Sequence, residues 1–232
     1  MGSIDRHIFD SLPRGAVRGF LGMLLAPIED GGTNSRRGDM PMDKPFLTDI
    51  KELRRRARQH MEEGAVTEAY RADRDTLLRI LNEALATEIV CVLRYKRHYY
   101  MASGIHAQAV AEEFLEHAGE EQGHADLIAE RITQLGGEPD LNPDGLLTRS
   151  HSEYIEGDGL IDMIKEDLVA ERIAIDSYAE MARYIGEDDP TTRRMLEGIL
   201  ASEEEHADDL RTLIRALGKD ERLDSRGQKK GA

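Results

Sequence analysis

Hydrophobic residues recur at spacings of three and four over most of the chain after residue 70, with polar residues between them. This is the period of an amphipathic α-helix, and it predicts helices at 71–101, 106–135, 160–185 and 190–217. Glycine or proline interrupts the pattern near 104, across 136–159 and at 186–190. The expected fold is therefore all-α, a four-helix bundle of two helical hairpins joined by one long crossover. The apolar positions of the first helix are Leu77, Leu78, Leu81, Leu85, Ile89 and Val92.

The segments outside these four helices have a different character. Residues 1–45 contain a glycine-rich polar stretch at 31–38, which predicts a flexible N-terminal extension. In the next segment, 46–70, a leading helix is expected at 47–61 with Thr48 as its cap, forming an N-terminal helical extension of the bundle. Five of its residues are basic, and this pattern is typical of a solvated helix face. Residues 218–232 are polar and basic, and a tail is expected there after Gly218.

The overall charge narrows the classes of partner. The formal net charge is -15, which disfavours binding to nucleic acid or anionic membranes and attracts cations, besides aiding solubility. The single cysteine, Cys91, has no partner within the chain for a disulfide, so a reducing compartment is expected. The apolar stretch at 16–28 is too short to span a membrane and is interrupted by Arg18. We therefore expect a cytoplasmic protein.

Two short motifs carry the candidate chemistry. The second bundle helix contains Glu121 and His124, and the fourth contains Glu203 and His206, each pair in the spacing E-x-x-H. This spacing puts a carboxylate and an imidazole on one helix face, one turn apart. A single such motif arises easily by chance in a chain so rich in glutamate, but two of them on partner helices are more informative.

The spacing of two further glutamates completes the pattern. Glu88 precedes Glu121 by 33 residues, and Glu171 precedes Glu203 by 32 residues. All four glutamates lie 16 or 17 residues from the turn of their hairpin, or about 24 Å at 1.5 Å per residue. The carboxylates are thus expected to meet at one level of the bundle. We call the following six residues the predicted ligand set: Glu88, Glu121, His124, Glu171, Glu203 and His206.

This duplicated half-site predicts a pair of metal ions. One glutamate from each of two helices and Glu-x-x-His from each of the other two is the arrangement of di-iron and di-manganese carboxylate bundles. Four carboxylates neutralise two divalent ions, and hard oxygen donors with two imidazoles suit iron, with manganese as the alternative. Any one of these glutamates by itself would be read as a solvated surface residue. Six residues in matched spacing favour the metal pair.

Four neighbouring residues extend the prediction. Tyr95 and Tyr178 each follow a predicted ligand by seven residues, so they are expected on the ligand face, either bonded to ligands or as core tyrosines. His117 lies four residues before Glu121 and also faces inward, where it could guide or bind a third metal. Asp167 lies one turn before Glu171 and could orient a ligand histidine.

At these residues the chain resembles the bacterioferritin and Dps-like branch of the ferritin superfamily. The run from Leu81 to Glu88 is similar to the first-helix signature of bacterioferritin, with Tyr95 at a further matching position. The resemblance spans about 75–217 and places the predicted ligand set on the ferroxidase ligands of that family. It implies a ferritin-like bundle and a ferroxidase that stores iron.

The chain also departs from the family patterns. Bacterioferritin has a methionine after the glutamate of its second helix, with which two subunits hold haem, and Gln122 stands there. Haem is therefore not expected. Dps-like proteins that keep this site are similar around Asp188-Asp189-Pro190, but the additional cysteines they usually carry are absent. The resemblance implies a homo-oligomer and leaves the type of cage open.

The expected function is oxidation of Fe(II) to Fe(III) with dioxygen or peroxide at an intrabundle di-iron site, for iron storage and detoxification. Two alternatives remain open at this stage. One is a peroxide-consuming enzyme of the rubrerythrin or manganese catalase kind, although the cysteine pairs of a rubredoxin domain are absent. The other is a DNA-protecting shell, against which the net charge of -15 counts.

Overall fold

The computed structural model describes residues 49–105 and 107–228, with only the backbone described from 218 onward. The chain divides into two units, Met1–Phe46 and Leu47–Ala232. The predicted extension at 1–45 lies outside the described residues. Within them the structure is helical and has no strand, which confirms the all-α prediction. The elements are α1 (Ile50–Arg56), a 3-10 turn (Met61–Glu63), α2 (Arg74–Met101), α3 (Ala107–Gln134), α4 (Leu146–Arg149), α5 (Leu160–Ile185) and α6 (Pro190–Gln228).

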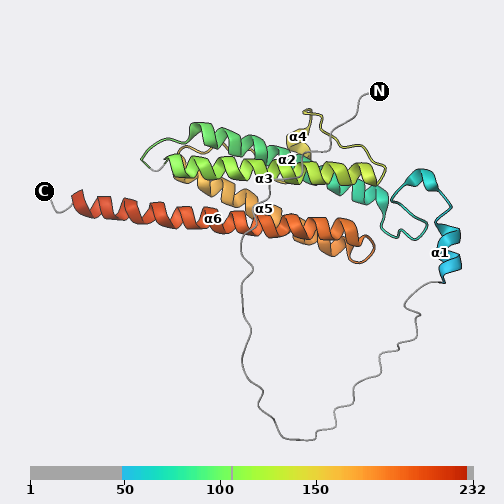
Figure 1. Cartoon of the computed structure of the whole chain (residues 1–232). Coiled ribbons are helices and arrows are strands. Elements are labelled where there is room, and N and C mark those ends of the chain that lie inside the picture. The colour runs from blue at the N-terminus through green and yellow to red at the C-terminus, as the bar shows by residue number, and fades with distance from the viewer. Residues whose placement is uncertain (1–48, 106, 229–232) are drawn as a thin grey trace, which may run out of the picture. The chain divides into compact units, whose positions relative to one another are not determined.

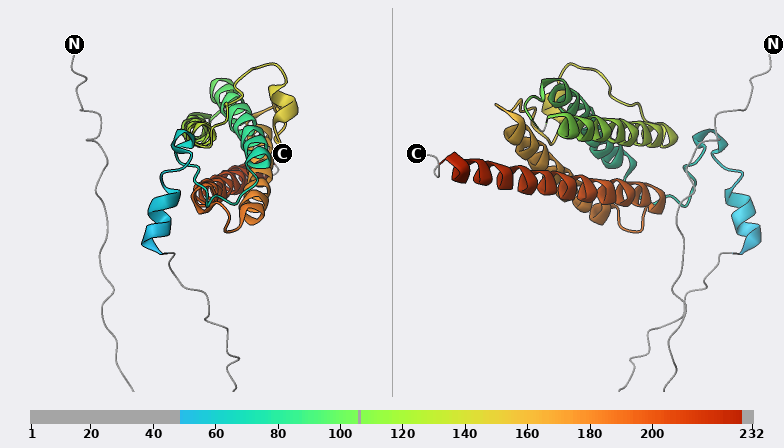
Figure 2. Two further views of the ribbon diagram at one scale, coloured as in Figure 1. Left: turned by 90° about the vertical axis from the view of Figure 1, so that its right-hand side faces the viewer. Right: turned by 60° about the vertical axis from the view of Figure 1, so that its left-hand side comes forward.

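Four long helices form the bundle (Figures 1 and 2). The hairpin of α2 and α3 packs on the hairpin of α5 and α6, so that α2 lies beside α5 and α3 beside α6. One apolar cluster fills the bundle around Leu81, Leu85 and Ile128. A second cluster lies around Phe114 and Leu210. Along each helix, buried glutamate and histidine residues occupy the positions between these two clusters.

Aspartates begin two of the long helices. The Asp73 side chain accepts a bond from the Thr76 backbone at the start of α2. At the start of α6, Oδ1 of Asp189 accepts from the backbone N–H of Thr191 and Thr192, at 3.1 and 2.9 Å. Such side chains satisfy backbone donors that have no partner within the helix. They explain why α6 begins at the proline that follows Asp189.

The long crossover between α3 and α5 is tied to α2 by polar contacts. The backbone N–H of His151 donates to the Thr87 hydroxyl at 2.9 Å. Arg94, which is 1% exposed, donates to the Ser152 hydroxyl and the Glu153 carbonyl. These bonds let the crossover run along the bundle without an apolar core of its own. The sequence did not predict the short helix α4 within this crossover.

Two helix boundaries differ from prediction. The leading helix was expected at 47–61 but covers only Ile50–Arg56, with Asp49 as the capping residue; Thr48 lies outside the described residues. None of its residues is buried, and a short helix with no packed face is marginally stable. At the other end, α6 continues past Gly218 to Gln228 instead of ending near Leu217. One glycine costs a helix only about 1 kcal/mol, and the residues after it are mostly good helix formers.

No helix in the described ranges is long and apolar enough to cross a lipid bilayer.

Candidate metal centre

All six residues of the predicted ligand set meet inside the bundle. Each of the four long helices contributes a glutamate from its buried face, and α3 and α6 each add a histidine one turn later. Their side chains are nearly inaccessible to solvent, from 0% exposed at Glu203 to 8% at His124. The expectation that the carboxylates lie at a common level therefore agrees with their placement between the two apolar clusters.

The set divides into two overlapping groups of four. Glu88, Glu121, His124 and Glu203 each offer a ligand atom, and these atoms lie within 4.8 Å of one another. The same is true of Glu121, Glu171, Glu203 and His206. The two groups share Glu121 and Glu203, one glutamate from each E-x-x-H motif. This is the geometry expected for two adjacent ions bridged by two carboxylates, each with one terminal carboxylate and one imidazole.

The polar atoms at the centre of this cluster have no hydrogen-bond partner among the described residues. These atoms are Oε2 of Glu88, Oε1 of Glu121, both carboxylate oxygens of Glu203, and Nδ1 of His124 and His206. Nδ1 of His124 lies 2.9 Å from Glu203, and Nδ1 of His206 lies 3.5 Å from the same carboxylate, without hydrogen-bonding geometry. Unsatisfied buried polar groups are costly, so their concentration at one point fits a site that metal cations would complete.

The charges of the cluster are balanced by protons when no cation is bound. Burial raises the pKa of Glu88 well above its usual value, and the charge of Glu121 raises it further. Burial alone would lower the pKa of His124, but the carboxylates of Glu121 and Glu203 raise it to about 12. Bound divalent ions would take the place of these protons, because a metal-ligating imidazole must be neutral at the ligating nitrogen.

Each of the two buried tyrosines bonds to a glutamate of the opposite hairpin. Tyr95 on α2 donates its hydroxyl proton to Oε1 of Glu171 on α5, and Tyr178 on α5 donates to Oε1 of Glu88 on α2. Both rings are almost fully buried. The bonds hold one oxygen of Glu171 and one of Glu88 and leave the other oxygen of each directed at the cluster. This is the outer contact that the sequence suggested, and its crossed arrangement repeats the duplication of the chain.

His117 also lies beside the cluster. Its Nδ1 is 3.2 Å from the Tyr95 hydroxyl, and its ring stacks on His206 with 4.1 Å between the centroids. Burial lowers the pKa of His117 to about 4, and the charge of His206 acts in the same direction. His117 is therefore a neutral imidazole against the side of a predicted ligand.

Residues 78–219 match a family described as the ferritin-like domain. This match covers more than half of the chain. The chain belongs to the ferritin-like family.

Ferritin-like relatives are found by sequence and by structure. A nutrient stress-induced DNA-binding protein of Synechococcus is 32% identical over 131 residues, covering 55% of this chain and 74% of that protein. Bacterioferritin of Rhodobacter capsulatus is 30% identical over 139 residues, covering 60% and 82%. A bacterioferritin-related protein of Bacteroides fragilis, described as a dodecameric thioferritin, has a TM-score of 0.63 at 32% identity, covering 65% and 91%. The resemblance to bacterioferritins and Dps-like proteins is confirmed.

Asp167 does not have the role expected from the sequence. Within the described ranges, its carboxylate bonds to Arg94 and to Nδ1 of His98, each at 2.8 Å, and not to a histidine of the predicted ligand set. The prediction was wrong because Asp167 faces Arg94 and His98 of α2, at the level of the apolar cluster around Phe114 and Leu210. There it neutralises a buried arginine that holds the crossover.

Glu120 is a contact that sequence reasoning missed. Its Oε2 lies 2.5 Å from Nε2 of His206, so it accepts the proton of that nitrogen and leaves Nδ1 facing the cluster. Ligating histidines commonly donate their other N–H to a carboxylate in this way. The pair links α3 to α6, so the spacing of residues along a single helix cannot predict it. Gln122, next to Glu121 of the predicted ligand set, is half-buried and donates to Asp126 at 3.0 Å.

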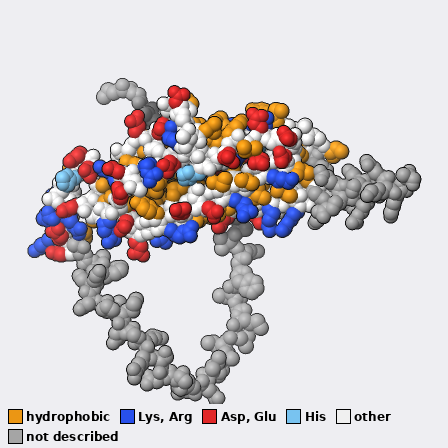
Figure 3. All heavy atoms as spheres, turned by 180° about the vertical axis from the view of Figure 1, so that it is seen from behind, with side chains coloured by type: hydrophobic (Ala, Val, Ile, Leu, Met, Phe, Trp, Pro, Cys, Tyr) orange, Lys and Arg blue, Asp and Glu red, His pale blue; other side chains and the backbone are white. Residues whose placement is uncertain are grey.

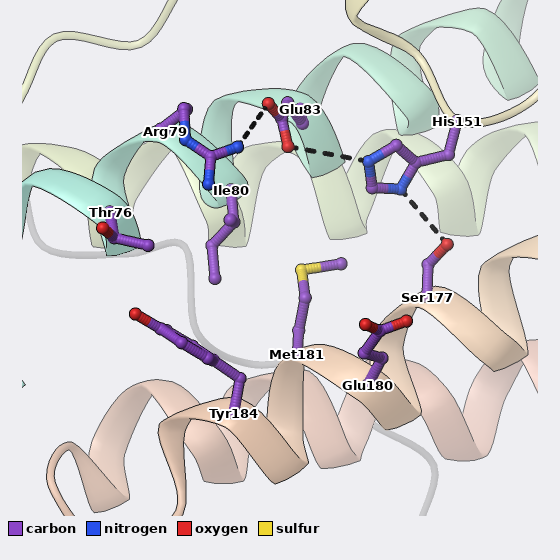
Figure 4. A pocket seen from close by; sticks show the side chains of 9 residues that line it. All are labelled: Thr76, Arg79, Ile80, Glu83, His151, Ser177, Glu180, Met181 and Tyr184. Carbon is purple, nitrogen blue, oxygen red and sulfur yellow. Dashed lines mark hydrogen bonds and ion pairs between the residues drawn. The ribbon is translucent and has the colours of Figure 1, made fainter. Parts of the chain in front are cut away.

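Two grooves lie between pairs of bundle helices. A groove of about 650 Å³ between α3 and α6 is lined by His124 and by apolar residues that include Leu127, Met195 and Ile199. It therefore reaches the edge of the predicted ligand set. A second groove of about 340 Å³ lies between α2 and α5. Figure 4 shows His151 of the crossover reaching into it, with its two ring nitrogens toward Ser177 and Glu83. This second groove contains none of the six residues.

Proposed function

We propose that this chain is a ferroxidase and an iron storage and detoxification protein, which oxidises Fe(II) to Fe(III) at the predicted ligand set. One observation carries the proposal: the two overlapping four-residue groups share two bridging glutamates. Two-metal sites hold ions about 3.5–4 Å apart, and shared carboxylates impose such a distance. Two Fe(II) ions then give up one electron each to one oxidant molecule.

Iron is the metal that best fits the donors. Four carboxylates carry the charge of two divalent ions and bind the trivalent product more strongly, while two imidazoles suit iron in the divalent state. The relatives named bacterioferritin support this choice; the description of the Rhodobacter capsulatus structure names a metal-free dinuclear site together with haem iron. Manganese is the alternative, which metal analysis of the purified protein separates. We propose no haem, because an amide stands at position 122.

The chain itself positions the substrate ions and balances charge. Glu121 and Glu203 would hold both ions, and Glu88 and Glu171 would hold one ion each. Tyr178 and Tyr95 orient these last two carboxylates. Reduction of dioxygen by two electrons takes up two protons and gives hydrogen peroxide; reduction of peroxide by two electrons and two protons gives two waters. Both routes avoid one-electron products, which is the chemical advantage of a paired site.

Storage requires a second property, which is assembly around a cavity. We propose that the chain forms a homo-oligomeric cage; the related Bacteroides fragilis protein is described as dodecameric. The net charge of -15 would favour accumulation of cations by such an assembly. Light scattering that found only a monomer would remove storage and leave the oxidation chemistry standing.

The ferroxidase proposal is tested by aerobic addition of Fe(II) followed by stopped-flow absorbance. The variant Glu203→Ala is expected to lose at least 100-fold in initial rate, because it removes a carboxylate common to both ions. The matched control is Glu204→Ala, which changes the exposed neighbour on the same helix and should keep the wild-type rate. Oxidation by the wild type no faster than in buffer, or equal rates in the two variants, would exclude the proposal.

A DNA-protecting shell is the second candidate, favoured by the relatives named for DNA binding and DNA protection. Against it, acidic and basic side chains are interspersed on the face in Figure 3. On α1, Arg55 pairs with Glu52 at 2.7 Å, which neutralises part of the basic cluster. A gel shift across a salt series decides: no shift at low salt excludes this candidate. A peroxide-turnover assay tests the remaining alternative, a peroxide-consuming enzyme.

A further inference from the structure

We propose that Glu113, His117 and Asp209, the flanking triad, form a third divalent-cation site beside the predicted ligand set. One ligand atom from each of the three residues lies within 4.8 Å of the other two. His117 is 2% exposed, while the two carboxylates are half-buried and reachable from solvent. Two carboxylates and one imidazole form a donor set suited to Fe(II), Mn(II) or Zn(II). The proposal does not depend on which metal the predicted ligand set binds.

The direction of the hydrogen bonds assigns the free nitrogen of His117. The Tyr95 hydroxyl has one proton, and it is donated to Glu171. The oxygen of Tyr95 can therefore only accept from His117, so Nδ1 of His117 carries the hydrogen. With the hydrogen on Nδ1, Nε2 is the nitrogen left to bind a cation. His117 is thus fixed by its neighbours in the tautomer that a metal requires at Nε2.

The lone pair of Nε2 faces carboxylates and not a hydrogen-bond donor. Oε1 of Glu113 lies 3.5 Å from Nε2 of His117, and Asp209 approaches from α6. Within the described ranges, Nε2 makes no hydrogen bond. An imidazole lone pair directed at carboxylate oxygens is unfavourable, and either a shared proton or a cation between them relieves it. A bound divalent ion satisfies all three groups at once.

The duplicated bundle provides an internal comparison. An offset of 82 residues relates Glu121 to Glu203, and the same offset gives the positions equivalent to the flanking triad in the other half. Those positions hold apolar residues, which line the groove beside His124: Leu127, Met195 and Ile199. The fold therefore accepts apolar side chains at this level. The polar residues of the flanking triad are therefore not required by the packing of the bundle, which is consistent with a ligand on that side.

The position of the triad relates the third ion to the metal pair. The His117 ring stacks directly on His206, which belongs to the half-site of Glu171. The carboxylates of Glu116 and Glu120 add further negative charge around Glu113. A cation approaching along α3 and α6 on this side would meet the triad before the buried pair. The apolar groove on the side of His124 has no equivalent ligands.

The test is anomalous X-ray diffraction from crystals of the full chain soaked in Zn(II), which is redox-inert and accepts nitrogen and oxygen ligands. A zinc peak is expected within about 2.0–2.2 Å of Nε2 of His117, separate from the peaks at the predicted ligand set. In solution, calorimetry with Zn(II) should give one more ion per chain for the wild type than for the double variant Glu113→Gln/Asp209→Asn. Neither substitution touches the predicted ligand set.

The matched control is Glu112→Gln/Asp208→Asn, which makes the same change of charge one residue earlier on the same helices, at exposed positions. This control should keep the third peak and the wild-type stoichiometry. A wild-type crystal with zinc at the predicted ligand set but none at His117 would overturn the proposal, as would a third peak retained after Glu113→Gln/Asp209→Asn. Zinc at His117 and none at the predicted ligand set would support the third site and contradict the proposed function.

Discussion

At the scale of single residues, burial of the glutamates opposes the stability of the metal-free protein but suits metal binding. Glu203 is fully buried, and neither of its carboxylate oxygens has a hydrogen-bond partner among the described residues. Keeping a charge in that position is costly for the metal-free protein. Glu203 is also one of the two residues that both four-residue groups share. Function and metal-free stability therefore make opposite demands on this side chain.

Glu203→Gln is expected to raise the free energy of unfolding of the metal-free protein by about 1–3 kcal/mol, because it removes a buried charge. Urea titration in the presence of a chelator at pH 8 measures this, with Glu204→Gln as the exposed control. With Zn(II) at 100 times its Kd, the wild type should gain about 2.7 kcal/mol for each ion bound and the variant far less. A metal-free variant less stable than the wild type would show that Glu203 is structural.

The buried tyrosines give a second prediction at this scale. Tyr178→Phe removes the bond that orients Glu88 and should weaken metal binding by about 10–100-fold, the usual effect of losing a contact behind a ligand. Anaerobic titration with Co(II) measures the affinity. Tyr184→Phe, on the same helix but 58% exposed, is the control and should bind like the wild type. An unchanged metal affinity for Tyr178→Phe would show that this tyrosine only fills the core.

Sequence spacing identified the residues whose pattern occurs in both halves of the chain, but not the residues that occur in one half only. All six members of the predicted ligand set were visible because the half-site occurs twice at the same depth. Tyr95 and Tyr178 shared that repeat, so their contact with the cluster was also anticipated. Glu120 and Asp167 have no such signal, because their partners lie on other helices or at another level. Contacts across the bundle depend on packing, which spacing in one helix does not encode.

At the scale of elements, the crossover is held by a buried charge pair. Arg94 and Asp167 are 1% and 0% exposed, and Arg94 continues to Ser152 and Glu153 of the crossover. Arg94→Ala leaves Asp167 buried with only His98 beside it and should cost about 3–5 kcal/mol in the free energy of unfolding. Arg97→Ala, which breaks a more exposed pair with Glu156, should cost at most about 1 kcal/mol. Urea denaturation of both variants decides; equal losses would contradict this account.

The helix boundaries show which elements could be predicted. The prediction of 160–185 agrees with α5, because Gly159 and Gly186 bound a continuous apolar period. The leading helix was predicted too long, since its basic residues suit a helix but none of its side chains is buried. The end of α6 differs from the prediction because Gly218 has the character of a helix stop, yet the helix continues through it to Gln228. Sequence patterns therefore predicted helix boundaries best where side-chain packing also stabilises the helix.

At the scale of the whole molecule, several large apolar side chains are exposed on the surface of the bundle. On α2, Leu93 is 49% and Tyr100 is 78% exposed, and their spacing of seven places them on one face. Exposed apolar residues that gather on one face often mark contacts between proteins. They are candidates for the contacts of the proposed homo-oligomer, and they lie outside the predicted ligand set.

Separating assembly from chemistry gives the final prediction. Leu93→Glu/Tyr100→Glu introduces charges on this face and should reduce the mass measured by light scattering to that of smaller species. The bundle interior is untouched, so the initial rate of Fe(II) oxidation should stay within about twofold of the wild type. Without a closed cavity, however, the ferric product should precipitate and not remain in solution with the protein. Leu93→Met/Tyr100→Phe keeps the face apolar and should retain both mass and soluble iron. A charged variant that still assembled would move the interface elsewhere, and one that lost its oxidation rate would show that the metal pair itself depends on assembly.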